Sequence, residues 1–271
     1  MKRRIRFLKI LSFAAAAALI WLILAVTNAF TGNPISSLVA KKAIERHVEQ
    51  TYPDLALHIG KTSFNFKFHE YWAKASSETS PDTYFNVYYR NGKVQYDEYD
   101  SRVVGRMNTG ERLEKQYSAH ITPLLETIEG LSNTRAFVML DTPMDEAREK
   151  LALDMKFEPN LPLNVRLNIY ADMQAPSLSK MTDVLEQVHQ RLLSAGCTFI
   201  EYSIDVQGDG GQMSASFVKP KDIESGELAS RLETAWISAQ ASEVPDLKED
   251  LKEDSPIETE HDIYVYIRKA E

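Results

Sequence analysis

The sequence predicts an α+β protein in which an N-terminal transmembrane helix is followed by two domains built from helices and antiparallel strands. Two observations support this prediction. Residues 10–30 form an unbroken uncharged run behind a basic N-terminus. Beyond that run, apolar residues recur with helical spacing in some segments and alternate with polar residues in others, as helices and strands with one buried side require.

The first thirty residues predict the membrane helix. Five basic residues lie in the segment Lys2–Lys9, and the predominantly apolar run from Ile10 to Phe30 that follows carries no charge. At a rise of about 1.5 Å per residue this run makes a helix of roughly 31 Å, which is long enough to cross the hydrocarbon core. A cleavable signal peptide has a shorter apolar region of about 7–15 residues that ends in an A-x-A-like site, so the sequence favours an uncleaved anchor.

The distribution of basic residues predicts the orientation of that helix. The first fifteen residues after the run contain only Lys41 and Lys42 as basic residues. Positive charge concentrates on the cytoplasmic side of a membrane helix, so we expect residues 1–9 to be a cytoplasmic basic segment and residues 10–30 to span the cell membrane once. The bulk of the chain would then be extracytoplasmic.

Charge and cysteine content exclude several protein classes. Residues 31–271 contain 26 basic and 39 acidic residues, a net charge of −13. This balance is the opposite of the one that nucleic-acid binding requires, so no nucleic-acid partner is expected. The single cysteine, Cys197, cannot form an intramolecular disulfide, and we interpret it as a small buried apolar residue.

The first predicted domain, residues 31–130, begins with a helix. Asn33 is placed to cap the helix, Pro34 suits its first turn, and Pro53 follows its end. One stripe of this helix is suited to burial and consists of Ala40, Ala43, Ile44, His47, Val48 and Tyr52. Ile35, Leu38 and Val39 fall outside the stripe, where they either contact lipid headgroups or close the end of the domain.

An antiparallel sheet should complete this domain. The apolar alternation changes phase near Gly60, which predicts a break or bulge in the strand there. Further on, Asn91-Gly92 suits a two-residue type I′ hairpin turn. In an uninterrupted register this turn pairs Tyr89 with Val94 and Val87 with Tyr96, so that the core face of the hairpin consists of Phe85, Val87, Tyr89, Val94 and Tyr96.

The reverse face of the same hairpin is the candidate interaction surface. It is expected to present Tyr84, Tyr88 and Tyr99 among polar side chains. We interpret these three tyrosines as a possible partner-binding surface, although tyrosine is also common in strands for packing reasons alone.

The second predicted domain, residues 131–271, has the element order β-α-β-β-α-β, preceded by an extra strand at residues 135–140. This order is the signature of the split βαβ, or ferredoxin-like, arrangement. It predicts a four-stranded antiparallel sheet in which Ile263–Ile267 pairs beside Val165–Ala171. Residues 243–262 form an acidic loop, which we expect to be a solvated connection.

Known catalytic and metal-binding motifs fail on specific residues. His69-Glu70 begins an H-E-x-x-H pattern, but position 73 is Ala and the context is a strand. Asp205 and Asp209 resemble part of a calcium loop, but Ser216 stands where the closing Glu should be. The sequence therefore predicts no catalytic residue, no cofactor-binding residue and no metal ligand.

A resemblance to a known family adds to this interpretation. The stretches "NPISSLVAKKAIERHVEQTYPDL", "DTYFNVYYRNGKVQYDEY" and "NTGERLEKQY" resemble the N-terminal domain of the YfjL-like family of Bacillus-type bacteria. The resemblance covers residues 33–117 and is faint beyond them. It implies a short membrane segment followed by an extracytoplasmic two-domain region, and it brings no established activity.

Two functions are compatible with these observations. The first is a non-catalytic binding or regulatory module, held at the membrane and contacting a protein, a peptide or a cell-wall polymer through exposed aromatic or sheet-edge surface. The second is an anchored hydrolase with an unrecognised carboxylate site in the interdomain cleft. Because no active-site motif is present, we favour the binding module over an enzyme.

Overall fold

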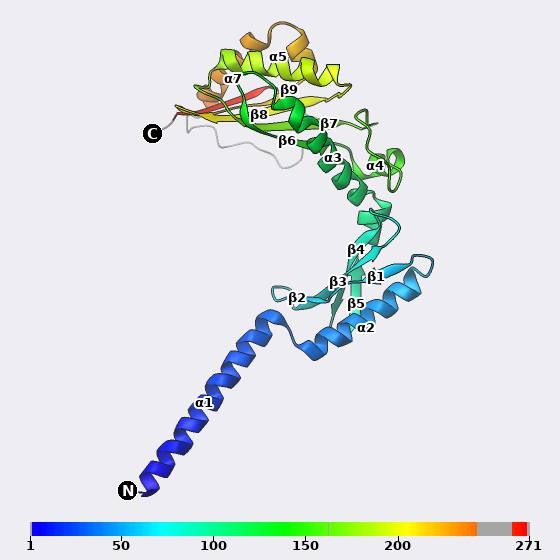
Figure 1. The fold of residues 1–271 in the computed structure, drawn as a ribbon, viewed down its shortest axis with the longest axis vertical. Helices are drawn as coiled ribbons and strands as arrows, with labels where there is room; N and C mark the ends of the chain where they lie inside the picture. Colours follow the sequence, from blue (N-terminus) through cyan, green and yellow to red (C-terminus); the bar gives the residue numbers. More distant parts are fainter. Residues whose placement is uncertain (1, 162, 243–261, 270–271) are drawn as a thin grey trace. The chain divides into compact units, whose positions relative to one another are not determined.

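The computed structural model describes residues 2–161, 163–242 and 262–269, and it confirms a mixed α+β protein with an apolar N-terminal helix (Figure 1). The described chain divides into two compact units, Met1–Asn108 and Thr109–Glu271. Helix α1, Lys2–Thr31, has the length and apolar composition needed to cross a membrane, and the apolar part of the helix is exposed.

The N-terminal unit places one helix and one π-helical turn beside a five-stranded antiparallel sheet. Strands β1 and β2 pair with successive parts of one edge of β3, and β4 and β5 continue the sheet on the other side. The elements are α2 (Pro34–Thr51), β1 (Leu57–Ile59), β2 (Ser63–Asn65), β3 (Glu70–Ser77), β4 (Tyr84–Arg90), β5 (Lys93–Asp97) and the π-helical turn η1 (Asp100–Val104).

Helix α2 and the break near Gly60 are as predicted. The Asn33 side chain caps α2 by accepting hydrogen bonds from the backbone N–H groups of Ile35 and Ser36. Three residues of the predicted stripe, Ala40, Ile44 and Val48, are buried against the sheet. The strand stops at Ile59 and restarts at Ser63, which confirms the break between β1 and β2.

The β4–β5 hairpin confirms the predicted turn but corrects the predicted register. Asn91 and Gly92 both have positive φ, and Tyr89 pairs with Val94. The next pair is Tyr88 with Tyr96, so Gln95 is an extra, bulged residue. One inserted residue moves every later side chain to the other face of a strand. Tyr96 is therefore 52% exposed instead of belonging to the core.

Among its described residues, the C-terminal unit contains five helices and a second five-stranded sheet. The first of these helices is α3 (Met107–Leu125). Two short helices, α4 and α6, were not predicted. The remaining elements are β6 (Ser132–Leu140), α4 (Met144–Lys150), β7 (Val165–Asp172), α5 (Leu178–Ser194), β8 (Glu201–Gly208), β9 (Gly211–Val218), α6 (Pro220–Glu224), α7 (Leu228–Ser242) and β10 (Tyr264–Lys269).

The predicted ferredoxin-like strand pairing is wrong, although the order of the elements along the chain is as predicted. The strands lie in the order β10-β9-β8-β7-β6, in which β7 and β8 are parallel and every other pair is antiparallel. Strand β10 pairs with β9, with Val265 opposite Ala215. The edge of β7 that the last strand would need is already taken by β6, the strand that stood apart from the predicted motif.

The buried apolar side chains of the C-terminal sheet lie on one face, which helices α5 and α7 cover in Figure 1. Helix α3 covers the free edge of β6, because the side chains of Ser118 and Glu114 accept hydrogen bonds from the backbone N–H groups of Val138 and Leu140. Since the apolar side of α3 belongs to this core, the units divide after Asn108 and not at the predicted residue 130.

Cys197 is fully buried in the same core, as its interpretation as an apolar residue required. The acidic loop at residues 243–262 was predicted as a solvated connection, and residues 243–261 of it lie outside the described residues.

Candidate binding surfaces

The face of the C-terminal sheet that α5 and α7 leave uncovered is the first candidate surface. Strict alternation along β6 and β7 sends every second side chain to this face, and the register sets them in cross-strand rows. One row joins Arg135, Tyr170, Asp205 and Ser214 across four strands. A neighbouring row joins Phe137, Asn168 and Ser203.

Four large aromatic or apolar side chains are exposed on this face, among them Tyr264 of β10, which is 50% exposed and pairs with Ser216. Phe137 is 49% exposed, Met139 is 53% exposed and Tyr170 is 45% exposed. The Phe137 and Tyr170 rings meet edge to face with their centroids 5.5 Å apart. Exposed apolar side chains that gather on one face, with polar residues around them, are typical of an interaction site.

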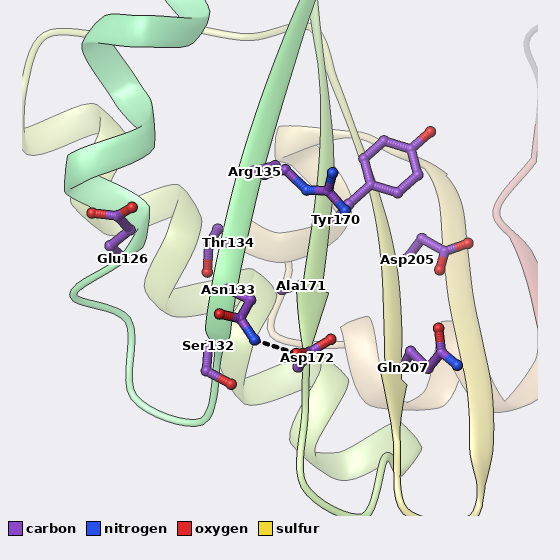
Figure 2. A pocket seen from close by; sticks show the side chains of 10 residues that line it. All are labelled: Glu126, Ser132, Asn133, Thr134, Arg135, Tyr170, Ala171, Asp172, Asp205 and Gln207. Carbon is purple, nitrogen blue, oxygen red and sulfur yellow. Dashed lines mark hydrogen bonds between the residues drawn. The ribbon is translucent and has the colours of Figure 1, made fainter.

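The exposed face is hollowed beside Tyr170. A cavity of about 670 Å³ opens between the end of α3 and the middle strands, and Figure 2 shows the side chains that line it. Arg135 and Tyr170, which pair across β6 and β7, are among them. Tyr170 also lines two further hollows on this face, so it lies where the three meet.

The charged groups of this face are paired to different degrees. Arg166 lies 2.7 Å from a carboxylate oxygen of Asp141. Asp172 accepts a hydrogen bond from the Asn133 amide at 2.5 Å, drawn as a dashed line in Figure 2. Arg135 has no ion pair with any residue that the structure describes. Its guanidinium, next to Tyr170, can therefore bind an anionic group of a ligand.

The open face of the N-terminal sheet is the second candidate surface and contains two of the three predicted tyrosines. Tyr84 receives the Lys74 ammonium over its ring at 3.9 Å. Tyr88 stacks on Tyr96 with ring centroids 4.5 Å apart, and its hydroxyl donates to Glu98 at 2.8 Å. Burial and the Glu98 carboxylate together raise the pKa of Tyr88 to about 12.

Tyr99, the third predicted tyrosine, lies on the helix side of the same sheet. Its ring is 4.4 Å from that of Tyr52 and 5.2 Å from that of Phe85, which is a core residue. The backbone N–H of Tyr99 donates to Asp97 at 3.0 Å. The structure therefore brings Tyr84 and Tyr88 onto one face and separates Tyr99 from them.

Asp97 links α2 to the last strand of the N-terminal sheet. Besides the Tyr99 N–H, its carboxylate accepts a hydrogen bond from the Tyr52 hydroxyl at 3.0 Å and lies 2.9 Å from the His47 Nε2. Burial and the Asp97 carboxylate raise the pKa of Tyr52 well above its ordinary range. His47 is thus partly buried and hydrogen-bonded, as predicted from its place in the stripe.

A metal site or an acid–base site needs several ligating or titratable side chains close together. Within residues 2–161, 163–242 and 262–269, no group of three or more His, Cys, Asp or Glu side chains is arranged to hold a metal ion. The buried His189 lies 2.8 Å from the Tyr202 hydroxyl and 3.1 Å from Glu224, which ties α5 to β8 and to the end of α6.

Sequence reasoning missed Phe137, Tyr170 and Tyr96 as surface aromatics. For Tyr170 the signal was present, because it alternates with the apolar Ile169 and Ala171 of the same strand. For Phe137 the neighbouring strand had to be known before it could be placed beside Tyr170. For Tyr96 the signal was misleading, because a hairpin bulge cannot be located from the alternation alone.

Fold and surfaces together define a class of protein: an α+β protein in which, among the described residues, one helix is suited to spanning a membrane and each of two sheets has one face covered by helical structure. The chain belongs to the YfjL-like family. The YfjL-like N-terminal domain matches residues 7–98, and the YfjL-like C-terminal domain matches residues 116–233.

A named relative agrees with this assignment. The chain is 24% identical over 212 residues to "Uncharacterized protein YfjL" of Bacillus subtilis (strain 168), an alignment that covers 74% of this chain and 89% of that protein. No solved structure matches the chain significantly.

Proposed function

We propose that the chain is a single-pass membrane protein with an extracytoplasmic bulk, and that it acts as a non-catalytic binding module for a protein or peptide segment. The binding surface is the open face of the C-terminal sheet. The observation that carries this proposal is the exposure of Phe137, Met139 and Tyr170 beside Arg135, which has no ion pair with any described residue. An apolar centre with a neighbouring cation suits a polypeptide that offers apolar side chains and a carboxylate.

The C-terminal face is favoured over the predicted tyrosine surface of the N-terminal sheet. Tyr88 already uses its hydroxyl on Glu98 and its ring on Tyr96. Tyr84 likewise receives Lys74 over its ring. Groups satisfied within the domain gain less from a partner, because each new contact replaces an existing one. Tyr84 and Tyr88 remain a secondary contact in this proposal.

Crosslinking in living cells, followed by identification of the captured partner, tests the binding proposal. The double variant Phe137→Ser, Tyr170→Ser should lose the partner while its melting temperature stays close to that of the parent chain. Ile237→Ser is a matched control, because Ile237 is 59% exposed on α7 and lies on the covered side of the sheet. Equal capture of the partner by the parent chain, the double variant and the Ile237→Ser control would contradict the proposal. Capture of a cell-wall polymer would contradict the assignment of a protein or peptide partner.

The proposed orientation rests on the basic segment before α1 and on the length of its apolar run. Protease added to cells stripped of their wall should degrade both units, and before that treatment the intact chain should fractionate with membranes. Recovery of a soluble form that begins near Phe30 would contradict the anchor.

The hydrolase alternative, with its site in an interdomain cleft, stays a prediction. The cavity within the C-terminal unit has carboxylates of its own, from Glu126, Asp172 and Asp205. Asp205 accepts hydrogen bonds from Gln212 at 2.9 and 3.1 Å, which gives it a structural role in the sheet. Cleavage of the captured partner that is lost in Asp205→Asn and kept in Gln212→Ala would favour the hydrolase.

A further inference from the structure

Exposed apolar side chains gather where α1 meets the N-terminal domain. The turn between β2 and β3, which we call the aromatic turn, consists of Phe66, Lys67 and Phe68. Both phenylalanines are 53% exposed, and Phe30 at the end of α1 is 59% exposed. Three further residues on the first turns of α2 are exposed by 52–73%: Ile35, Leu38 and Val39.

The aromatic turn is held against the end of α1 by specific contacts. The Phe30 and Phe66 ring centroids are 5.3 Å apart. Between the helices, Gly32 is buried with φ +76°, and a Cβ added to it would lie 2.7 Å from the Phe64 ring. The Asn33 N–H donates to the Tyr71 hydroxyl at 2.8 Å. These contacts leave the connection little freedom, because only glycine fits at Gly32.

This geometry fixes the depth of the aromatic turn relative to the membrane. The predominantly apolar run ends at Phe30, before Thr31 and Asn33, so in a spanning α1 Phe30 lies at the outer boundary of the hydrocarbon. Phe66 lies beside it and must sit at a similar depth. Asn65 helps to hold the turn by accepting a hydrogen bond from the Lys67 N–H at 3.1 Å.

The distribution of charge also indicates that a membrane is the partner of this surface. Residues 10–44 and 55–69 contain no Asp or Glu, although residues 31–271 as a whole carry a net charge of −13. Both segments contain lysines, and the Lys67 ammonium lies 5.6 Å from the centre of the Phe68 ring. An aromatic turn that contains a lysine, and whose nearest acidic residue in the sequence, Glu70, is buried, suits the boundary where acyl chains meet anionic phosphates.

The first turns of α2 present a second apolar contact of the same kind. Ile35, Leu38 and Val39 follow i, i+3, i+4 spacing, so they share one side of the helix. Ile35 lies about 180° around the helix from the buried Ile44, given 100° per residue. This side of α2 therefore faces away from the sheet that the helix covers.

We propose that the aromatic turn and the exposed side of α2 enter the headgroup region of the outer leaflet. The N-terminal domain then contacts the membrane directly instead of being attached to it only through a flexible linker. The partner of this surface is a bilayer that contains anionic lipid. This inference rests on the proposed anchoring by α1, and the two are separable by experiment.

The test places a nitrobenzoxadiazole probe on single introduced cysteines of the full chain in phosphatidylglycerol-containing vesicles. Cys197 is buried, so the parent chain should remain unlabelled. The variants are Ala17→Cys in the middle of α1, Phe66→Cys in the aromatic turn, Leu38→Cys on α2 and Ile237→Cys as an exposed control. Lys67→Cys repeats the measurement with both phenylalanines in place.

At positions 17, 38, 66 and 67 we expect blue-shifted emission that spin-labelled lipid quenches, with little change at 237. If 17 is quenched while 66 and 67 behave like 237, the membrane contact of the turn is overturned and the anchor stands. A water-exposed probe at 38 overturns the contact of α2. If 17 itself behaves like 237, α1 does not span and both proposals fail.

Discussion

The two sheets share one plan but differ in how many contacts the side chains of their open faces make within their own domain. Each sheet has five strands, and its buried apolar residues lie on the helix side. On the N-terminal open face, Tyr88, Tyr96 and Glu98 contact one another. On the C-terminal open face, Phe137 and Tyr170 are about half exposed, and Arg135 has no ion pair within the described residues. The C-terminal open face is therefore the stronger candidate binding surface, because it offers a cation that has no ion pair among the described residues.

The largest expected effect tests whether the two cores are independent. Phe85→Ala should destabilise the N-terminal unit by about 3–5 kcal/mol, and Leu167→Ala should destabilise the C-terminal unit by about 2–5 kcal/mol, through lost burial and residual cavities. Both side chains are at most 1% exposed. Hydrogen exchange measured peptide by peptide should show a loss of protection only in the unit that carries the substitution. A loss of protection spread equally over both units would contradict the division after Asn108.

Removing the Asp97 carboxylate should have the next largest effect. Asp97→Asn should cost about 1–3 kcal/mol, because the partly buried carboxylate accepts hydrogen bonds from the Tyr52 hydroxyl and the Tyr99 backbone N–H and contacts His47. Chemical denaturation gives this value. Glu45→Gln is the control, since the exposed pair with Lys41 at 3.6 Å should contribute less than about 1 kcal/mol. Equal effects of the two changes would refute the structural role of Asp97.

Tyr96 offers a direct test of the bulge. Because Tyr96 lies on the open face, Tyr96→Ser should cost only the stacking on Tyr88, about 0.5–1.5 kcal/mol. Tyr89→Ser, at a position 8% exposed, should cost clearly more in the same urea titration. Similar losses for the two variants would restore the uninterrupted register and argue against a bulge at Gln95.

The smallest expected effect concerns pH. The raised pKa of Tyr88, about 12 against an ordinary value of about 10, means that the folded state disfavours the tyrosinate. Its contribution to stability is therefore complete below pH 10 and is lost as the pH rises toward 12. Between these values the unfolding free energy of Tyr88→Phe should fall less steeply than that of the parent chain. Identical slopes would show that Tyr88 is not the titrating group.

Much of the fold could be predicted because it depends on local patterns. The cap at Asn33, the Asn91-Gly92 turn and the alternation of β7 each need only a few neighbouring residues. The position of β10 could not be predicted in this way. Its place beside β9 depends on β6 already occupying the edge of β7, which is a competition between strands distant in sequence.

The candidate surface was predictable only in part, for the same reason. Tyr84 and Tyr88 share an open face because they alternate with core residues of one strand. Tyr99 follows the bulge and the end of β5, so its side could not be counted from the turn. Tyr170 and Arg135 come from different strands, and only their pairing makes them one surface.

The central claim, that the open face of the C-terminal sheet binds a polypeptide partner, is tested most directly by comparing the two sheets in living cells. A photo-crosslinking residue is placed either at position 170 or at position 84, and the captured species are identified. The account predicts a defined polypeptide adduct at 170, and a weaker adduct or none at 84. An adduct of equal or greater yield at 84, or no polypeptide adduct at 170, would contradict it.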